Sequence, residues 1–343
     1  MPEWSFADRE LMSRALELAA RGLYTTEPNP RVGCVLVHGE QVVGEGWHVQ
    51  AGEGHAEVNA LAQAGERARG ATAYVTLEPC SHFGKTPPCA DALIKAGVSR
   101  VVAAMQDPNP QVAGNGLQRL RDAGIEVTCG LLEEQARELN PGFIKRMQQG
   151  LPWVRVKLAM SLDGRTAMAS GESKWITGPA ARADVQRLRA RSGAVISGAD
   201  SVLLDDSALT VRASELGLSA DEAAAAVQRQ PLRVLIDSLR RVPLEQRFFR
   251  EAGPTLVIST SAEQAAESYQ SIGSELLALP GDDGKVDLVT VLRNLAERGC
   301  NEVLVEAGAG LSGAFWRAGL VDELIVYMAP RLLGSQARPL MQL

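Results

Sequence analysis

The sequence predicts an α/β fold arranged in two domains, and three observations lead to this expectation. The chain has 343 residues, about twice the ~150 that make up a typical domain. Apolar segments with strand-like and helix-like periods alternate along it. Hydrophobic residues make up 45% and charged residues 22%, which provides enough apolar material for packed cores. A disordered or fibrous chain is thereby excluded.

The first half begins with a helix, because Leu11, Ala15, Leu18 and Ala19 recur at helical spacing and Gly22 follows as a stop signal. Strands at 32–37 and 42–47 should form a hairpin. The pattern then predicts helices at 55–64, 90–96, 116–123 and 131–139, and strands at 72–77, 100–105 and 125–128. These elements indicate a sheet of mixed pairing with helices on its faces.

Residues 144–152 are polar and follow the helix stop Asn140-Pro141-Gly142, which predicts a linker there. We place the boundary between domains 1–147 and 148–343. The second domain should contain strands at 154–159, 194–197, 232–236, 255–258, 303–305 and 324–328, with helices at 180–191, 286–298 and 311–318. Residues 219–230 look like a surface helical insertion. We find no internal repeat, so the two domains are expected to differ.

The charge balance argues against a nucleic-acid-binding protein. The net charge is −6, and residues 1–150 hold 14 Lys and Arg against 18 Asp and Glu, whereas phosphate neutralisation needs a surplus of cations. Aromatic residues, which stack on single strands, are only 4%. No apolar run is long enough to span a bilayer, and the N-terminus is acidic where a secretory signal is basic. We therefore expect a cytoplasmic protein with small-molecule substrates.

Metal-ligand residue types are concentrated near the N-terminus, where all four histidines and three of the five cysteines lie. His55, Cys80 and Cys89 supply three ligands for Zn²⁺ and leave a fourth tetrahedral position for water. Glu57 begins the same predicted helix as His55 and can carry protons without binding the metal. Cys89 precedes a predicted helix, whose N-terminus favours a thiolate. The pattern predicts a catalytic zinc site.

Two alternatives stay open at this point: a different residue replaces one of the three ligands, as the unusual cysteine spacing allows, or the site is structural and not catalytic. Zinc-dependent base deaminases carry His-x-Glu and then Pro-Cys-x-x-Cys, whereas eight residues separate Cys80 from Cys89 here. His82, inside that interval, is a rival ligand. A structural site would close with a fourth protein ligand, which only His82, His48 or Cys34 could supply.

Four segments of the first half, at residues 28–35, 55–57, 77–89 and 106–110, closely resemble the bifunctional riboflavin-biosynthesis deaminase/reductase family, in which the long interval between the cysteines is characteristic. The resemblance implies a cytidine-deaminase-like α/β/α domain that hydrolyses an amino group of 2,5-diamino-6-ribosylamino-4(3H)-pyrimidinone 5′-phosphate. It implies His55, Cys80 and Cys89 as zinc ligands and Glu57 as the catalytic residue. Asn29, His48 and Lys85 match positions that bind the deaminase substrate.

In the second half, residues 308–313 read G-x-G-x-x-G between a predicted strand and a predicted helix, a context that suits a pyrophosphate. A Rossmann domain would place an acidic residue at the end of the next strand, but Asp322 and Glu323 precede that strand. We therefore expect dinucleotide binding without a Rossmann fold.

Residues 157–167, 173–178, 203–212 and 305–313 resemble the reductase half of the same family. The resemblance implies a dihydrofolate-reductase-like α/β domain that uses NADPH to reduce the ribosyl group of 5-amino-6-(5-phosphoribosylamino)uracil to ribityl. The substrate positions it implies are Ser173, Arg189, Leu209, Arg212 and Glu306. The cofactor positions it implies are Ala159, Trp175, Ser201, Asp205, Ser238, Gly308, Ala309, Gly310, Leu311, Ser312 and Gly313. Because this half contains no histidine, the proton donor must be a carboxylate, Lys157 or water.

The family normally continues beyond the point where this chain stops, so we expect an incomplete C-terminal edge of the reductase domain. We also expect a homo-oligomer. Two other functions are compatible with the motifs: a nucleic-acid base deaminase with an accessory nucleotide-binding domain, and a nucleotide sensor with a structural zinc site.

Overall fold

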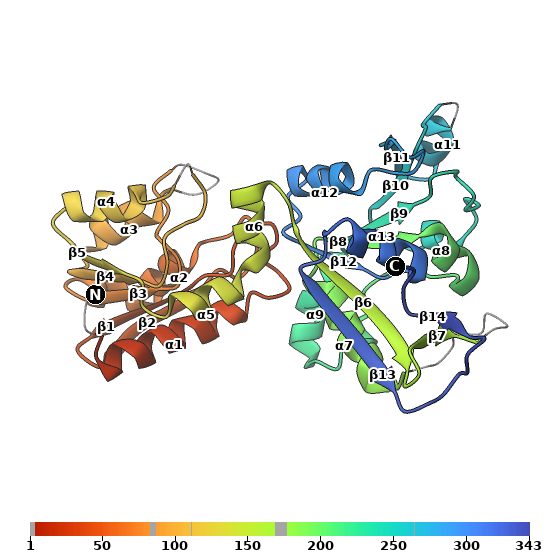
Figure 1. Ribbon diagram of the computed structural model, residues 1–343. Helices are drawn as coiled ribbons and strands as arrows, with labels where there is room; N and C mark the ends of the chain where they lie inside the picture. Colours follow the sequence, from red (N-terminus) through yellow and green to blue (C-terminus); the bar gives the residue numbers. More distant parts are fainter. Residues whose placement is uncertain (1–3, 83–86, 111, 169–176, 264) are drawn as a thin grey trace. The chain divides into compact units, whose positions relative to one another are not determined.

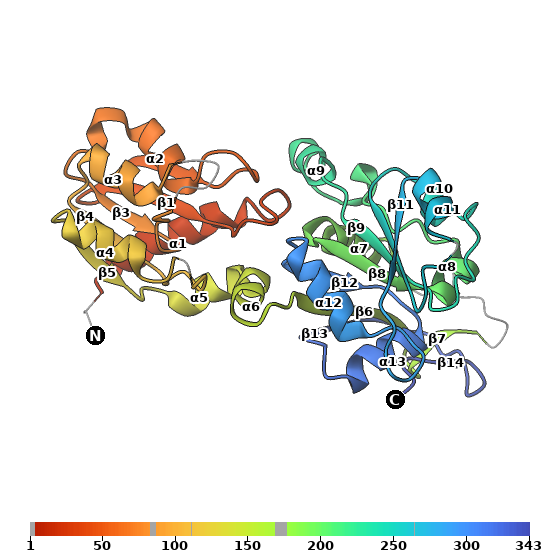
Figure 2. The ribbon, with the colours of Figure 1, turned by 90° about the horizontal axis from the view of Figure 1, so that it is seen from above.

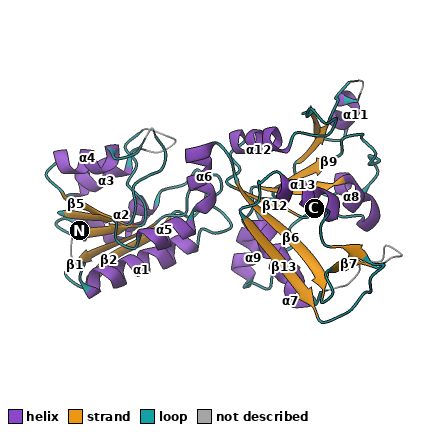
Figure 3. Cartoon of the chain, viewed as in Figure 1, coloured by secondary structure: helices purple, strands orange, loops and turns teal. Residues whose placement is uncertain are grey.

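The computed structural model describes residues 4–82, 87–110, 112–168, 177–263 and 265–343. The chain divides into two compact units, Met1–Gln149 and Gly150–Leu343 (Figure 1). Each unit contains one large sheet with helices on both faces (Figure 3). The predicted α/β class is thus confirmed for both halves of the chain.

The sheet of the first unit has five strands in the order β2-β1-β3-β4-β5. They are β1 (Gly33–His38), β2 (Gln41–Trp47), β3 (Thr72–Val75), β4 (Arg100–Ala103) and β5 (Glu126–Cys129). The hairpin partner β2 and the neighbour β3 both run antiparallel to β1, whereas β3, β4 and β5 are parallel to one another. The predicted hairpin and mixed pairing are confirmed.

Helices cover both faces of this sheet (Figure 1). On one face lie α1 (Phe6–Ala20) and α5 (Glu133–Leu139), and on the other lie α2 (Ala56–Ala64), α3 (Cys89–Ala96) and α4 (Asn115–Asp122). A short 3-10 helix, η1 (Gly65–Ala68), follows α2. In the chain α2 precedes β3, and α3 follows β3 after the segment that contains Cys80.

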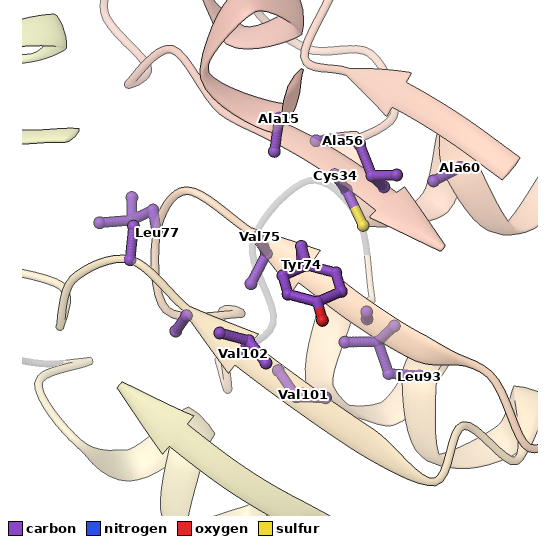
Figure 4. Packing of buried hydrophobic residues seen from close by; sticks show 14 of the residues in the cluster. Ala15, Cys34, Ala56, Ala60, Tyr74, Val75, Leu77, Leu93, Val101 and Val102 are labelled. Carbon is purple, nitrogen blue, oxygen red and sulfur yellow. The ribbon is translucent and has the colours of Figure 1, made fainter. Parts of the chain in front are cut away.

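Small residues allow α2 to lie directly on the sheet. A Cβ at Gly46 of β2 would collide with the backbone of Ala56 and Ala60 in α2, so only glycine permits this approach. Figure 4 shows the side chains of Ala56 and Ala60 beside Cys34 of β1, with Leu93 of α3 completing the layer. All four side chains are fully buried. This dense packing fixes the residues at the start of α2.

The polar segment expected to be a linker over 144–152 is mostly helix. Its residues belong to α6 (Pro141–Gln149), and Phe143, Ile144 and Met147 pack on the core of the first unit. The proline that we interpreted as a stop occupies the first position of this helix, where its missing N–H costs nothing. The linker is therefore shorter than predicted and consists of residues 150–152 between α6 and β6, because one apolar stripe is enough to dock a polar helix.

The sheet of the second unit has seven strands in the order β11-β10-β9-β8-β12-β6-β13, and all of its neighbouring pairs are parallel. They are β6 (Trp153–Ser161), β8 (Ala194–Gly198), β9 (Leu232–Ile236), β10 (Thr255–Ser259), β11 (Ser274–Ala278), β12 (Glu302–Val305) and β13 (Glu323–Ala329). Two further short strands, β7 (Arg165–Ala167) and β14 (Arg338–Pro339), pair with each other. The strand before G-x-G-x-x-G is β12, the sixth of these seven strands in chain order, whereas the Rossmann motif follows the first strand of its domain.

Two apolar layers enclose this sheet. Alternate residues of the strands point to opposite faces, so Val303 and Val305 pack in one cluster and Leu304 in the other. One layer contains α12 (Leu288–Glu297) and α13 (Ala309–Arg317) (Figures 1 and 2). The other draws on α7 (Pro179–Arg191), α8 (Ala199–Asp205), α10 (Arg247–Arg250) and α11 (Ala266–Ser271). The remaining helices are η2 (Ala213–Glu215) and α9 (Ala220–Val227).

The parallel strands bring their carboxyl ends to one edge of the sheet, where ligands bind in open α/β folds. Residues after β6, β8, β9 and β12 meet there although they are distant in sequence. Within the parts of the chain that the structure describes, no helix is both long and apolar enough to cross a membrane.

Candidate active sites

Three side chains of the first unit form a compact cluster of metal-ligand type. The ligand atoms of His55, Cys80 and Cys89 all lie within 4.8 Å of one another. His55 Nδ1 is 3.2 Å from Cys89 Sγ and 3.6 Å from Cys80 Sγ. His55 precedes α2, Cys89 is the first residue of α3, and Cys80 follows β3. Among the described residues this is the one such group, and its one nitrogen and two sulfurs suit Zn²⁺.

The surroundings of the cluster favour one thiolate even before a metal binds. The Cys89 thiol interacts with Cys80 Sγ and its backbone N–H donates to that sulfur at 3.3 Å, which together with His55 lowers the pKa of Cys80 although burial opposes this. The same interaction with Cys80 raises the pKa of the Cys89 thiol. Cys80 is likewise the main cause of a raised His55 pKa. A cation at this position would replace the shared protons and stabilise both thiolates.

Glu57 lies beside the cluster and is only 3% exposed. Burial, followed by the negative charge of Cys80, raises the pKa of its carboxyl group to about 7. A carboxyl group with such a pKa can both accept and return a proton near neutral pH. Glu57 is not a member of the ligand cluster, in agreement with the role predicted for it.

The alternative ligands do not join the cluster in the described part of the chain. His82 is exposed, and Cys34 is a fully buried member of the apolar core. The His48 ring uses both nitrogens elsewhere, with Nε2 3.0 Å from Asn29 Nδ2 and Nδ1 3.1 Å from the Gly54 carbonyl. Three protein ligands leave a coordination position open, as a catalytic zinc site requires.

Two of the predicted deaminase substrate residues lie next to the cluster. The His48 ring packs edge-on against the His55 ring, with centroids 5.3 Å apart, and Asn29 Nδ2 lies 3.0 Å from His48 Nε2. Burial lowers the pKa of His48 and favours its neutral form. Lys85, the third predicted substrate residue, is outside the described residues.

Glu78 is a buried carboxylate that our reading of the sequence missed. Its two oxygens accept four backbone N–H groups, from Asp107, Gly114, Gly116 and Leu117, at 2.8 to 3.2 Å. The residue is 3% exposed and stands two positions before Cys80. It thereby fixes the strand end that carries a ligand. An acidic residue directly after an apolar strand was the available signal.

At the carboxyl edge of the second sheet, two predicted cofactor segments meet. The Gly308 N–H, after β12, donates to Ser201 Oγ, in α8 after the neighbouring strand β8, at 3.0 Å. Ser238 lies just after β9, next along the same edge, and Ala159 lies in β6. Asp205 ends α8. Trp175, also predicted to contact the cofactor, is outside the described residues.

The glycines of G-x-G-x-x-G do not share one role. A Cβ on Gly313 would collide with the backbone of Gln342, so this glycine permits internal packing. Added Cβ atoms on Gly308 and Gly310 would meet their nearest neighbours only at 3.6 and 3.5 Å, which is ordinary contact. Both are exposed at the N-terminus of the nine-residue helix α13, where main-chain N–H groups attract anions. This cradle fits the pyrophosphate of a dinucleotide.

Arg189 and Glu306, both predicted to bind the reductase substrate, are bound to each other. The guanidinium contacts the carboxylate through two hydrogen bonds of 2.5 and 3.0 Å, and a third goes to the Thr210 carbonyl at 3.2 Å. Lys157 Nζ lies 4.0 Å from Glu306 Oε2 and 5.9 Å from the centre of the Tyr327 ring. Burial lowers the pKa of Lys157, while Arg189 overcomes burial and lowers that of Glu306.

The other predicted substrate residues are less closely grouped. Leu209 is buried and has a φ of 57°, a left-handed conformation that is unusual for a leucine. Arg212 forms a two-bond ion pair with Glu215, with both distances 2.6 Å. Ser173 is outside the described residues.

Family models match both units. The model of the RibD C-terminal domain matches residues 152–343, and that of the cytidine and deoxycytidylate deaminase zinc-binding region matches residues 6–105. The riboflavin biosynthesis protein RibD of Escherichia coli is 56% identical over 97% of this chain and 90% of its own length. The protein of the same name from Haemophilus influenzae is 54% identical over 100% and 91%. This chain belongs to the RibD family.

Solved RibD structures agree with this assignment. Acinetobacter baumannii RibD superposes with a TM-score of 0.90 at 51% identity, covering 98% of this chain and 90% of that one. A diaminohydroxyphosphoribosylaminopyrimidine deaminase/5-amino-6-(5-phosphoribosylamino)uracil reductase from Thermotoga maritima gives 0.84 at 37% identity, covering 97% and 89%. The predicted RibD-type family and its two-domain α/β fold are confirmed.

RibD membership also confirms the predicted enzyme class. The chain is a bifunctional enzyme of riboflavin biosynthesis, with a cytidine-deaminase-like zinc-binding domain followed by a dihydrofolate-reductase-like domain that uses NADPH. A separate nucleic-acid base deaminase is not favoured. The roles of individual residues stay predictions.

Proposed function

We propose that this RibD protein first deaminates 2,5-diamino-6-ribosylamino-4(3H)-pyrimidinone 5′-phosphate and then reduces the ribosyl group of 5-amino-6-(5-phosphoribosylamino)uracil. The observation that carries the first reaction is the cluster of His55, Cys80 and Cys89 beside buried Glu57. The second reaction is supported by the exposed glycines at the start of α13. The boundary predicted after residue 147 lies two residues before the end of the first unit at Gln149, and we propose that this division separates the two activities.

In the deaminase domain, His55, Cys80 and Cys89 hold zinc, which when bound lowers the pKa of its water. Glu57 removes a proton from the attacking water. A C–O bond forms at the ring carbon, and Glu57 gives the first proton to the ring nitrogen. Glu57 then takes the proton of the new hydroxyl group and gives it to the amine, while the C=O bond forms. The C–N bond breaks and ammonia leaves. Asn29, His48 and Lys85 bind the substrate around this position.

In the reductase domain, NADPH when bound supplies a hydride to C1′ of the opened sugar imine. The main chain at residues 308–313 would hold the pyrophosphate, and Ala159, Trp175, Ser201, Asp205 and Ser238 are the residues predicted to bind the rest of the cofactor. Ser173, Leu209 and Arg212 bind the substrate together with the pair Arg189 and Glu306. Lys157 and Glu306 lie 4.0 Å apart at this edge and are the candidate groups for carrying the proton to the imine nitrogen.

A coupled assay on the diaminopyrimidine phosphate tests the proposal by recording ammonia release and NADPH oxidation separately. We expect ammonia release without NADPH, and NADPH oxidation only after deamination or on supplied deaminated substrate. Rapid turnover of tRNA or single-stranded DNA, with none on the free pyrimidine phosphate, would contradict it. We propose no nucleic-acid partner, since the first 150 residues carry a net negative charge.

We further propose a cytoplasmic location and a homo-oligomeric state. All five cysteines carry free thiols, which suits a reducing compartment. At the edge strand β13, Leu324 is 40% and Met328 57% exposed, and such a surface suits a second copy of the chain. Light scattering of the purified protein measures the mass directly, and a strictly monomeric protein would contradict the second proposal.

A further inference from the structure

Asn140 lies at the junction between α5 and α6, and its side chain does not take part in the hydrogen bond that begins α6. Its main-chain carbonyl accepts the Ile144 N–H at 3.1 Å, which begins α6 through the backbone alone. The residue is only 6% exposed. Its side-chain amide is therefore available for a contact elsewhere in the first unit.

That contact is a two-way clamp on Arg31. The Arg31 N–H donates to Asn140 Oδ1 at 2.8 Å, and Asn140 Nδ2 donates to the Arg31 carbonyl at 2.8 Å. The amide thus replaces the donor and acceptor that a neighbouring antiparallel strand would offer. The two residues are 109 positions apart in sequence, and Arg31 is 5% exposed. Both main-chain groups of Arg31 depend on this one side chain for these buried hydrogen bonds.

The clamped segment leads to the metal cluster. Asn29, two residues before Arg31, is 3.0 Å from His48, whose ring packs against the predicted zinc ligand His55. The residue after Arg31 accepts the His48 main-chain N–H at 2.9 Å. Two further hydrogen bonds join the segment to α5 and α6: Arg31 Nη1 donates to the Leu139 carbonyl at 2.6 Å, and Arg146 donates to the Pro28 carbonyl at 3.2 Å.

We propose that Asn140 is a positioning residue for the deaminase pocket, which holds the segment 28–32 so that Asn29 and His48 keep their geometry beside the cluster. This inference rests on the proposed deaminase function. Only an amide can serve both groups of Arg31. A carboxylate would place an oxygen against the Arg31 carbonyl, and alanine would remove both of these buried hydrogen bonds.

The test uses the full-length, zinc-loaded enzyme and steady-state deamination of the diaminopyrimidine phosphate. We expect Asn140→Ala to raise KM by about tenfold or more while kcat changes less than about threefold, because a loosened binding segment removes uniform binding energy. Asn140→Asp keeps the acceptor for the Arg31 N–H but places an oxygen against the Arg31 carbonyl, so it should also raise KM. Glu138→Ala, an exposed change in the same helix, is the matched control and should leave both constants unchanged. Bound zinc and NADPH oxidation on supplied deaminated substrate should stay at wild-type levels in every variant.

A double-mutant cycle separates positioning from mere stability. If Asn140 acts through the segment that carries Asn29, Asn29→Ala and Asn140→Asp should raise KM by less together than the product of their separate effects. Unchanged KM in folded Asn140→Ala, loss of zinc together with activity, or fully multiplicative effects in the cycle would overturn the inference. If Asn140→Ala does not fold, the Asn140→Asp cycle decides. Ammonia release by the wild type decides the proposed function separately.

Discussion

The two units obtain their reactivity in different ways. The first contains all four histidines of the chain and a cluster of one imidazole and two thiols around a buried carboxyl group. The second contains no histidine, and its sheet edge offers exposed glycines and a network of Arg189, Glu306 and Lys157. Hydrolysis needs protein side chains that bind a metal and move protons, whereas hydride transfer takes its reactive group from a cofactor. We therefore expect that a substitution in one unit can abolish its activity without changing the activity of the other unit.

The largest effect should come from Glu57→Gln. Loss of a general acid–base group is expected to lower the deaminase kcat by about 10²- to 10⁴-fold. The amide keeps the shape of the side chain, so zinc content should be unchanged, as metal analysis would show. NADPH oxidation on supplied deaminated substrate should remain at the wild-type rate. Simultaneous loss of zinc would mean that Glu57 is a metal ligand.

Gly310→Asp should weaken NADPH binding by the second unit without affecting deamination by the first. A carboxylate at the start of α13 would repel the pyrophosphate, and like charges about 4 Å apart cost from ~1 kcal/mol in water to ~4 kcal/mol near a protein surface. We expect the KM for NADPH to rise at least about tenfold, while ammonia release is unchanged. Gly310→Ala is the control, because its Cβ would make only ordinary contact. Equal damage to both activities would show that the domains are not independent.

The stability of the first unit alone should fall in Glu78→Gln. Its amide nitrogen cannot accept the main-chain N–H groups that one carboxylate oxygen now accepts, which should cost about 1–3 kcal/mol of unfolding free energy. Hydrogen exchange over residues 107–117 should accelerate, while exchange in β12 should not change. Glu134→Gln, an exposed change on α5, serves as the control. Equal protection of residues 107–117 in both variants would contradict this role.

The smallest effect should be a pH-dependent contribution of Asp8. Burial opposes ionisation of Asp8, but hydrogen bonds from Ser5 and Tyr74, with the charge of Arg100, lower its pKa to about 2. Because the folded pKa lies below the unfolded value, this carboxylate stabilises the fold above about pH 4 and loses its contribution as the pH falls toward 2. The stability difference between wild type and Asp8→Asn, measured by urea unfolding, should narrow over that range. A constant difference would contradict the assignment.

Much of the fold could be predicted from the sequence. In both units, segments with a strong hydrophobic period form the helices and strands that this period predicts. The predicted hairpin corresponds to β1 and β2, and the strand predicted at 232–236 is β9. The errors have local causes. Residues 144–152 are polar, yet one apolar stripe docks α6. The short elements α8, α10, α11 and β14 carry too few residues to show a period.

The candidate sites divide in a similar way. His55, Glu57, Cys80 and Cys89 could be predicted because zinc chemistry restricts the types of residue and because the segments that carry them resemble one family. The contacts of Glu78 and Asn140 could not be predicted. Each side chain binds main-chain N–H or C=O groups, which occur in every sequence and therefore give no signal in this one. The glycines 308, 310 and 313 look alike as a motif, and only their neighbours in space separate packing from ligand access.

The sequence by itself determined the chemistry: which residue types can hold a metal, which can carry a proton, and where a helix can begin with glycine. Local patterns and side-chain type are sufficient for these properties. The tertiary structure alone decided which groups meet. Arg189 reaches Glu306 from 117 residues away, and Asn140 reaches Arg31 from 109. Such contacts depend on strand order and helix packing, because a buried polar group must find its partner wherever the fold brings one.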